Sequence, residues 1–325
     1  MPAIRQIDEL EAGLRRSFDR AHLEVYADAL QATGDPRGEL IVIDLDADLG
    51  KTTPEHTERR RELVARMLPA HSSIQLRHGF VEIGTPTNLD AIDAVLLGPL
   101  GSYVRMITIA GPAKQIRRAI TTLALRERPW LDRMIIRQGD PGYVQLSREL
   151  TIALVEATPR LELLDVIGRR LFPLVPHPSI GKLIAAPFDA LAALLATGNH
   201  PACLPNVTDL DYLFGVNYQG LPPEQTHELL PSSQLPALRR LDLTRNLNLH
   251  AGLDLFRIIE RLDIAVQLDY LRVPAVRHVE QALRLQAALD RMQNLVELEV
   301  VDAYHPTHVL HHPSAKITLP RKPRA

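Results

Sequence analysis

The sequence contains a single cysteine, Cys203, among its 325 residues. One thiol can form neither an internal disulfide framework nor a multi-cysteine metal site, so the chain suits a reducing compartment. We expect Cys203 to be a small buried apolar residue. Aromatic residues make up only 4% of the chain, and aliphatic side chains must therefore supply most of the core.

Charge of one sign is also lacking, because 37 Lys and Arg residues are balanced by 39 Asp and Glu residues. The net charge of −2 creates no positive field for a phosphate backbone, so nucleic acid is not expected as a partner. No window approaches about eighteen uninterrupted apolar residues, and the first residues lack the apolar centre of a signal peptide. We therefore expect a cytoplasmic protein with no membrane partner.

The familiar catalytic signatures are missing as well. The sequence has no GxSxG nucleophile elbow, no GxGxxG turn between a strand and a helix, and no CxxC pair. These absences remove the best-known hydrolase, dinucleotide-binding and redox classes. We predict a protein that is not an enzyme and needs no cofactor.

A short apolar motif recurs along the chain. Residues Leu238 to Asn246 read LRRLDLTRN and fit LxxLxLxxN, the strand of a leucine-rich repeat. Eight degenerate copies of the LxxLxL core accompany it, and successive copies begin about 27 residues apart on average. The framework residues of the nine copies are Phe80/Ile83/Thr85, Val104/Ile107/Ile109, Leu131/Met134/Ile136, Leu161/Leu164/Val166, Ile180/Leu183/Ala185, Val207/Leu210/Tyr212, Leu238/Leu241/Leu243, Leu268/Leu271/Val273 and Leu295/Leu298/Val300. A period of this length predicts stacked units whose cores are completed by their neighbours.

Apolar runs of helical spacing lie between these strands, at Leu146 to Val155, Phe188 to Leu195 and Val276 to Leu289. The order strand, turn, helix, turn predicts an α/β fold, a leucine-rich-repeat-like solenoid with parallel concave strands and convex helices. The asparagine that follows the strand is present only at Asn88 and Asn246. A continuous ladder of asparagine side chains therefore cannot form, and we expect an irregular arc.

The first 70 residues are predicted to form a separate helical cap, followed by about nine irregular repeats over 71–312 and by a strand and basic tail over 313–325. Apolar faces at Ile7 to Phe18 and at Leu23 to Leu30 predict two helices, which a Gly34-Asp35-Pro36 turn closes. A third helix is predicted near Thr53, with Thr52 and Glu55 as its capping box. A pair between Asp28 and Arg37 is expected across the turn.

Within this segment, residues 25–41 read VYADALQATGDPRGELI. They resemble the signature of the bacterial repeat-companion domain, VYADWLEERGDPRGEFI, although Ala29 stands where that family usually has Trp. Residues 77–83, RHGFVEI, resemble the RxGFVE stretch that opens the repeats in such proteins of myxobacteria and planctomycetes. The resemblance implies a small helical domain in front of leucine-rich-like repeats, no established enzymatic activity, and an interaction role.

The strand residues between the framework positions should face the concave side, because side chains alternate along a strand. Met106, Ile135, Leu163, Ile167, Ile184 and Leu213 could form one contiguous apolar patch there, with Arg133, Arg137, Asp209 and Asp211 as its polar rim. The predicted partner-binding surface consists of Met106, Arg133, Ile135, Arg137, Leu163, Asp165, Ile167, Ile184, Asp209, Asp211, Leu213, Arg240 and Tyr270. The leading hypothesis is thus a non-catalytic scaffold module that binds a protein partner.

Two alternatives remain. His308 and His312 have the i, i+4 spacing of two metal ligands on a helix, and Asp302 lies nearby, so the tail could belong to a metal-binding module or a metal-dependent enzyme. Pro306 and Pro313 bracket this cluster and favour loop histidines instead. The chain could also be a structural subunit of a larger assembly that makes its contacts through proline-rich loops.

Overall fold

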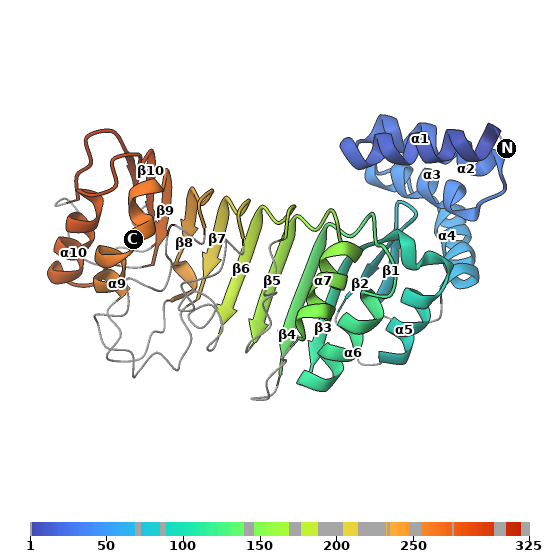
Figure 1. The fold of residues 1–325 in the computed structure, drawn as a ribbon. Coiled ribbons are helices and arrows are strands. Elements are labelled where there is room, and N and C mark those ends of the chain that lie inside the picture. The colour runs from blue at the N-terminus through green and yellow to red at the C-terminus, as the bar shows by residue number, and fades with distance from the viewer. Residues whose placement is uncertain are drawn as a thin grey trace.

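The computed structural model describes residues 2–68, 73–84, 89–139, 146–168, 177–187, 204–213, 232, 235–246, 255–274, 276–301 and 310–319. These residues form an α/β chain built on an eleven-stranded sheet (Figure 1). The strands stand side by side in the order in which they occur in the sequence. The first two strands are antiparallel, and each later neighbour pairs in parallel.

The strands are β1 (Ile74–Arg77), β2 (Phe80–Ile83), β3 (Val104–Gly111), β4 (Arg133–Gln138), β5 (Leu163–Gly168), β6 (Lys182–Pro187), β7 (Asp209–Tyr212), β8 (Arg240–Asp242), β9 (Tyr270–Val273), β10 (Glu297–Val300) and β11 (Lys316–Thr318). The α-helices are α1 (Pro2–Arg16), α2 (Arg20–Ala32), α3 (Pro36–Asp48), α4 (Pro54–Met67), α5 (Leu89–Leu97), α6 (Ala113–Leu123), α7 (Arg148–Ala157), α9 (Leu255–Arg261) and α10 (Val279–Leu289). Short 3-10 turns are η1 (Pro99–Tyr103), η4 (Thr244–Asn246) and η5 (Asp263–Gln267). No helix among the described residues is long and apolar enough to cross a membrane.

The N-terminal segment holds four helices, where the sequence predicted three. Asp35 accepts a hydrogen bond from the backbone N–H of Arg37, and Pro36 is the first residue of α3, so this helix begins within the predicted turn. Gly34, with φ of 76°, makes the left-handed turn that ends the preceding helix. The predicted capping box is also corrected, because the hydroxyl of Thr53, not that of Thr52, accepts the backbone N–H of His56 and caps α4.

The few aromatic residues gather where these helices meet the sheet. The Phe80 ring lies 4.6 Å from Trp130, 5.2 Å from Phe18 and 6.4 Å from Tyr103, measured between ring centroids. Phe80 belongs to β2, and Tyr103 and Trp130 precede β3 and β4, so α1 and α2 pack at the amino ends of these strands. This aromatic cluster joins the N-terminal helices to the sheet across the predicted boundary near residue 70.

The framework residues form the core of the sheet. Every described framework residue is buried, while Thr85 lies outside the described residues. The predicted inward register is therefore confirmed. Two of the predicted helical runs correspond to α7 and α10, and the run from Phe188 to Leu195 lies outside the described residues.

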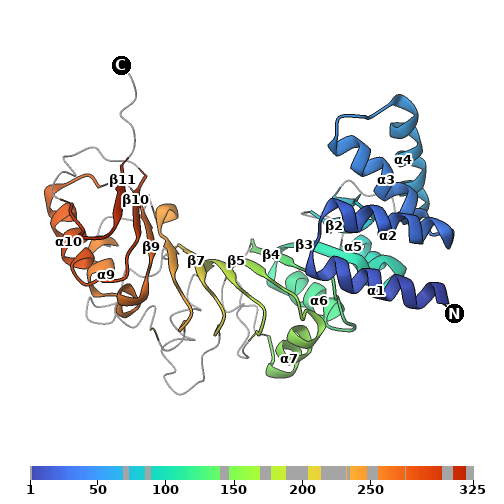
Figure 2. The same ribbon diagram turned by 90° about the horizontal axis from the view of Figure 1, so that it is seen from above.

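The sheet is curved, and α6, α7, α9 and α10 lie on its convex side (Figure 2). The opposite, concave side of the strands carries the residues that alternate with the framework. Asn246, beside β8, is buried and donates from Nδ2 to the carbonyls of Tyr212 at 2.7 Å and Leu243 at 2.9 Å. This side chain connects the turn after β8 to the end of the neighbouring strand β7. Asn88, the other asparagine that follows a predicted strand, lies outside the described residues.

Candidate interaction surface

The concave face is built from the alternating side chains of parallel strands in continuous register. One row across the strands runs Met106, Arg133, Leu163, Lys182, Asp209, Arg240, Tyr270 and Glu297. The next, which we call the middle row, runs Thr108, Ile135, Asp165, Ile184, Asp211, Asp242, Arg272 and Glu299. The predicted surface residues Ile167 and Leu213 lie beyond it, beside Arg137 and after β7 respectively.

The six predicted apolar residues are all partly exposed, as a binding surface requires. Their direct neighbours across the sheet are mostly polar residues. Ile135 has Thr108 and Asp165 as its direct neighbours, and Leu163 has Arg133 and Lys182. Ile135, Leu163 and Ile184 are therefore neighbours along diagonals between adjacent strands, which are about 7–8 Å apart and within reach of long side chains. Aliphatic and polar or charged side chains therefore alternate across the surface. The register between neighbouring strands places unlike residues side by side.

The charged residues predicted as a polar rim lie among the apolar residues and not around them. Both terminal nitrogens of Arg137 donate hydrogen bonds to the carboxylate of Asp165 on β5, one of them to Oδ1 at 2.7 Å. Asp165 is only 7% exposed. A two-pronged guanidinium–carboxylate contact is directional and stronger than a neutral hydrogen bond. Arg137 and Asp165 thus fix the centre of the face.

Toward the C-terminal strands, ion pairs continue across the face. Arg240 lies 3.1 Å from Asp209, and its guanidinium stands 4.2 Å from the centre of the Tyr270 ring. The Tyr270 hydroxyl donates to Glu299 at 2.7 Å. Burial and this hydrogen bond raise the pKa of Tyr270 to about 12. The phenol therefore stays protonated at neutral pH and acts as a donor.

Arg272 completes this network, lying 3.2 Å from both Asp242 and Glu299. Asp242 also accepts hydrogen bonds from the backbone N–H and the hydroxyl of Thr244, at 2.8 and 2.6 Å. Arg272, Asp242 and Glu299 face the concave side as sequence alternation implies, but their pairing depends on residues about 30 positions apart. No local pattern in the sequence contains that information.

Asp211 is the exception to this pairing. Its Oδ1 is buried and has no hydrogen-bond partner among the described residues, and its nearest cation, Arg245, lies 3.6 Å from Oδ2. Burial raises the pKa of Asp211 to about 6; Asp242 and Asp165 add to the rise, and Arg245 and Lys182 partly offset it. The centre of the concave face therefore holds a carboxylate that is short of donors. Arg245 was missed by sequence reasoning because it follows its strand instead of belonging to it.

Arg133 and Lys182 are exposed and Met106, Ile167, Ile184 and Leu213 are partly exposed, each on the predicted side of its strand. All thirteen predicted surface residues lie on described strands or directly after them. The structure therefore brings them to one side of one sheet. Binding by this surface remains a prediction.

The metal alternative finds no support at the histidine that the structure describes. His308 and Asp302 lie outside the described residues. His312 is buried, with Nε2 at 2.9 Å from the Met292 carbonyl oxygen and Nδ1 accepting the N–H of Ala315 at 2.9 Å. Both ring nitrogens thus have protein partners. Within the described residues, no three His, Cys, Asp or Glu side chains are placed to hold a metal ion together.

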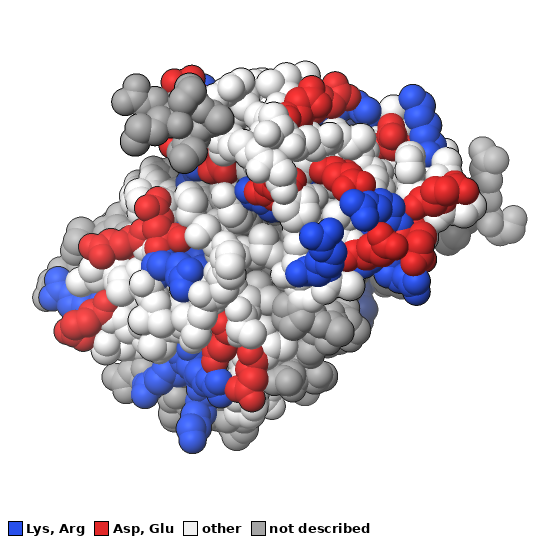
Figure 3. Space-filling view, turned by 90° about the vertical axis from the view of Figure 1, so that its right-hand side faces the viewer, with Lys and Arg blue, Asp and Glu red and all other residues white. Residues whose placement is uncertain are grey.

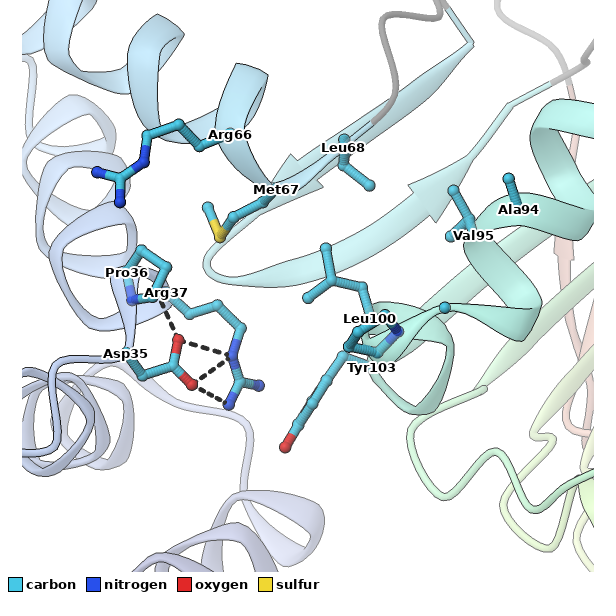
Figure 4. Close-up of a pocket in the computed structure, with 12 residues that line it drawn as sticks. Asp35, Pro36, Arg37, Arg66, Met67, Leu68, Ala94, Val95, Leu100 and Tyr103 are labelled. Carbon is cyan, nitrogen blue, oxygen red and sulfur yellow. Dashed lines mark hydrogen bonds and ion pairs between the residues drawn. The ribbon is translucent and has the colours of Figure 1, made fainter.

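A cavity of about 590 Å³ lies where α3 and α4 meet α5 and η1 (Figure 4). Its walls include Met67, Leu68, Val95, Leu100 and Tyr103. Arg37 also lines it, but its guanidinium is held by Asp35 at 2.7 Å and lies 3.6 Å from the centre of the Tyr103 ring. Arg37 therefore pairs with Asp35 and not, as the sequence had suggested, with Asp28. It lies at the interface between the N-terminal helices and the sheet.

Acidic and basic side chains are interspersed at the N-terminal end of the molecule (Figure 3). Arg59 contacts Glu39 at 2.7 Å and Glu62 at 3.0 Å, and Arg61 contacts Glu58 at 2.6 Å. Such exposed pairs contribute little to stability. Their mixture gives this end no strong field of one sign, in agreement with the low net charge of the chain.

Comparison with known proteins adds little to this geometry. No protein-family profile matches the chain, and no curated protein matches it. A similar solved structure is that of a protein from Bacteroides fragilis, determined by the Northeast Structural Genomics Consortium. It shares 16% sequence identity over 91% of this chain and 83% of that chain, with a TM-score of 0.48. The likeness carries no argument about function, and the resemblance to the repeat-companion domain stays a prediction.

Proposed function

We propose that this chain is a leucine-rich-repeat-like solenoid with an N-terminal helical cap, and that it serves as a protein-binding module. The repeat assignment is supported by the sequential parallel strands and by the burial of the framework residues. From β3 to β10, the framework residues of neighbouring strands belong to one continuous buried cluster, as expected for stacked repeats. The cap assignment is supported by the aromatic cluster around Phe80, which covers the amino ends of the first strands.

The observation that carries the interaction role is the exposure of aliphatic side chains on the concave face. Ile135, Leu163 and Ile184 are partly exposed in the middle of the sheet, on the side that the helices leave uncovered. A sheet face that only contacts water favours polar residues at such positions. Fixed ion pairs beside these aliphatic groups add directional contacts that a complementary protein surface can match.

The test is loss of a partner without loss of the fold. Ile135→Asp and Leu163→Asp each place a charge where the partner's apolar surface is expected. Ile135 and Leu163 are already partly buried, so less than half of the roughly 1.5–3 kcal/mol for burying such a side chain remains to be gained on binding. The introduced carboxylate would in addition lose water without gaining a partner, which costs roughly 1–3 kcal/mol or more. Each variant should therefore weaken the complex by about tenfold or more. The measurement is quantitative affinity purification from cells, followed by titration of the purified pair.

Leu283→Asp is the matched control, because Leu283 is 55% exposed on the convex helix α10. This variant should retain every partner that the unchanged chain captures. Circular dichroism and thermal unfolding of all three variants separate a lost surface from a lost fold. If Leu163→Asp folds normally and keeps its partners as well as Leu283→Asp does, the concave face is not the binding surface.

A further inference from the structure

Asp211 places a chemical requirement on whatever covers the concave face. The other acids of the middle row have donors, since Asp165 is gripped by Arg137 and Asp242 by Arg272 and Thr244. Asp211 has one cation at 3.6 Å and a buried oxygen without a donor among the described residues. Arg245 therefore compensates only in part for the partial removal of this carboxylate from water, and such a group favours an added positive charge.

Among the described residues, the cations of the neighbouring row form no ion pair with Asp211. Arg133 and Lys182 lie in the neighbouring row and are exposed, so water already hydrates them. The last torsion of an aspartate is broad, so either oxygen of Asp211 can turn toward an incoming donor. The direct neighbours of Asp211 in the row are Ile184 on β6 and Asp242 on β8, and Leu213 lies two residues further along the chain. This part of the face thus combines a carboxylate that lacks hydrogen-bond donors among the described residues with apolar surface next to it.

We propose that the partner presents an extended segment with a lysine or arginine over Asp211 and aliphatic side chains over Ile184 and Ile135. This inference rests on the proposed function, since it names the chemistry of the partner for the same surface. Asp211 and Ile135 lie three strands apart in one row, which is about 14 Å at about 4.8 Å per strand. Residues i and i+4 of an extended chain lie on one side and about 13 Å apart. The expected motif is a basic residue with aliphatic residues two and four positions away.

The experiment is selection of displayed random dodecapeptides on the immobilised full chain, in parallel with its Asp211→Asn and Ile135→Asp variants. The unchanged chain should enrich peptides with Lys or Arg and aliphatic residues two and four positions away. Asp211→Asn should lose the basic preference and bind the selected peptides about tenfold more weakly. Replacing the basic residue of a selected peptide by norleucine should cause the same loss on the unchanged chain and little loss on Asp211→Asn.

The outcomes separate this inference from the proposed function. The inference is overturned if binding of the selected peptides depends on Ile135 but the peptides show no preference for a basic residue. It is also overturned if that preference persists on Asp211→Asn. Either result still leaves the concave face as the binding surface. Peptides that are indifferent to both variants contradict the inference and the proposed function together. Sedimentation velocity identifies a second copy of the chain as the occupant if self-association is lost on Ile135→Asp, and that result also overturns the inference. Failure to enrich any peptide on the unchanged chain does so too.

Discussion

Replacing Asp211 with asparagine should stabilise the free protein at neutral pH. The environment raises the pKa of Asp211 from 3.8 to about 6, and each pKa unit corresponds to about 1.4 kcal/mol. The charged carboxylate therefore weakens the folded state by about 3 kcal/mol at most. Asparagine keeps the shape and removes the charge, so a gain of about 1–3 kcal/mol is expected once the hydrogen-bonding needs of the amide are included.

This gain should depend on pH in a defined direction. Between about pH 6 and pH 4 the folded chain binds a proton at Asp211 more tightly than the unfolded chain does, so protonation relieves the cost. The contribution of Asp211 to stability consequently improves as the pH falls through 6, and it is fully restored below about 3.8. The advantage of Asp211→Asn should be largest above pH 7 and should shrink toward pH 4.

Urea unfolding at pH 7.5, 6 and 4.5 measures this difference. Asp165→Asn is the matched control, because the same chemical change at a paired carboxylate of the same row breaks the contact with Arg137. It should destabilise the protein by about 1–3 kcal/mol at pH 7.5. The reasoning about the concave face is refuted if Asp211→Asn destabilises the chain as Asp165→Asn does, or if its effect is the same at all three pH values.

Three further predictions concern single residues that stabilise the fold. Asn246→Ala removes the hydrogen bonds from Nδ2 to the carbonyls of Tyr212 and Leu243 and should lower the free energy of unfolding by about 1–3 kcal/mol, which urea unfolding measures. Gly101→Ala places a Cβ against the carbonyl oxygen of Leu96, closer than their van der Waals radii allow, so it should destabilise the chain by about 1–3 kcal/mol or more; an unchanged thermal midpoint would contradict that contact. Burial lowers the pKa of His177 from 6.5 to about 4. The neutral, buried imidazole therefore contributes fully to the stability of the folded chain above pH 6.5, and this contribution is lost as the pH falls toward 4. His177→Gln should therefore lose less stability than the unchanged chain over that interval in acid titrations followed by circular dichroism.

The strands and their buried side could be predicted from the sequence because the framework spacing carries both. Leu238, Leu241 and Leu243 set the pattern, and poorer copies such as Ile180, Leu183 and Ala185 are buried in the same register. Burial depends on the period of two along each strand, which is a local property.

The arrangement of side chains on the concave face could not be predicted in the same way. Whether Ile135 lies beside Leu163 or beside Asp165 depends on how two strands about 28 residues apart align, and no local signal fixes that alignment. The missing donor at Asp211 is a property of the assembled face for the same reason. The helix α3 was missed because Asp35, Pro36 and Gly38 read as turn residues, although an aspartate cap followed by proline also begins a helix.

The most direct test of the central claim is site-specific photo-crosslinking in cells. A benzoylphenylalanine in place of Ile135 projects from the concave face, and one in place of Leu283 projects from the convex helix α10. We predict that the probe at position 135 yields a discrete crosslinked protein that the probe at position 283 does not, and that Asp211→Asn reduces its yield. A discrete product from position 283 with none from position 135 would contradict the account.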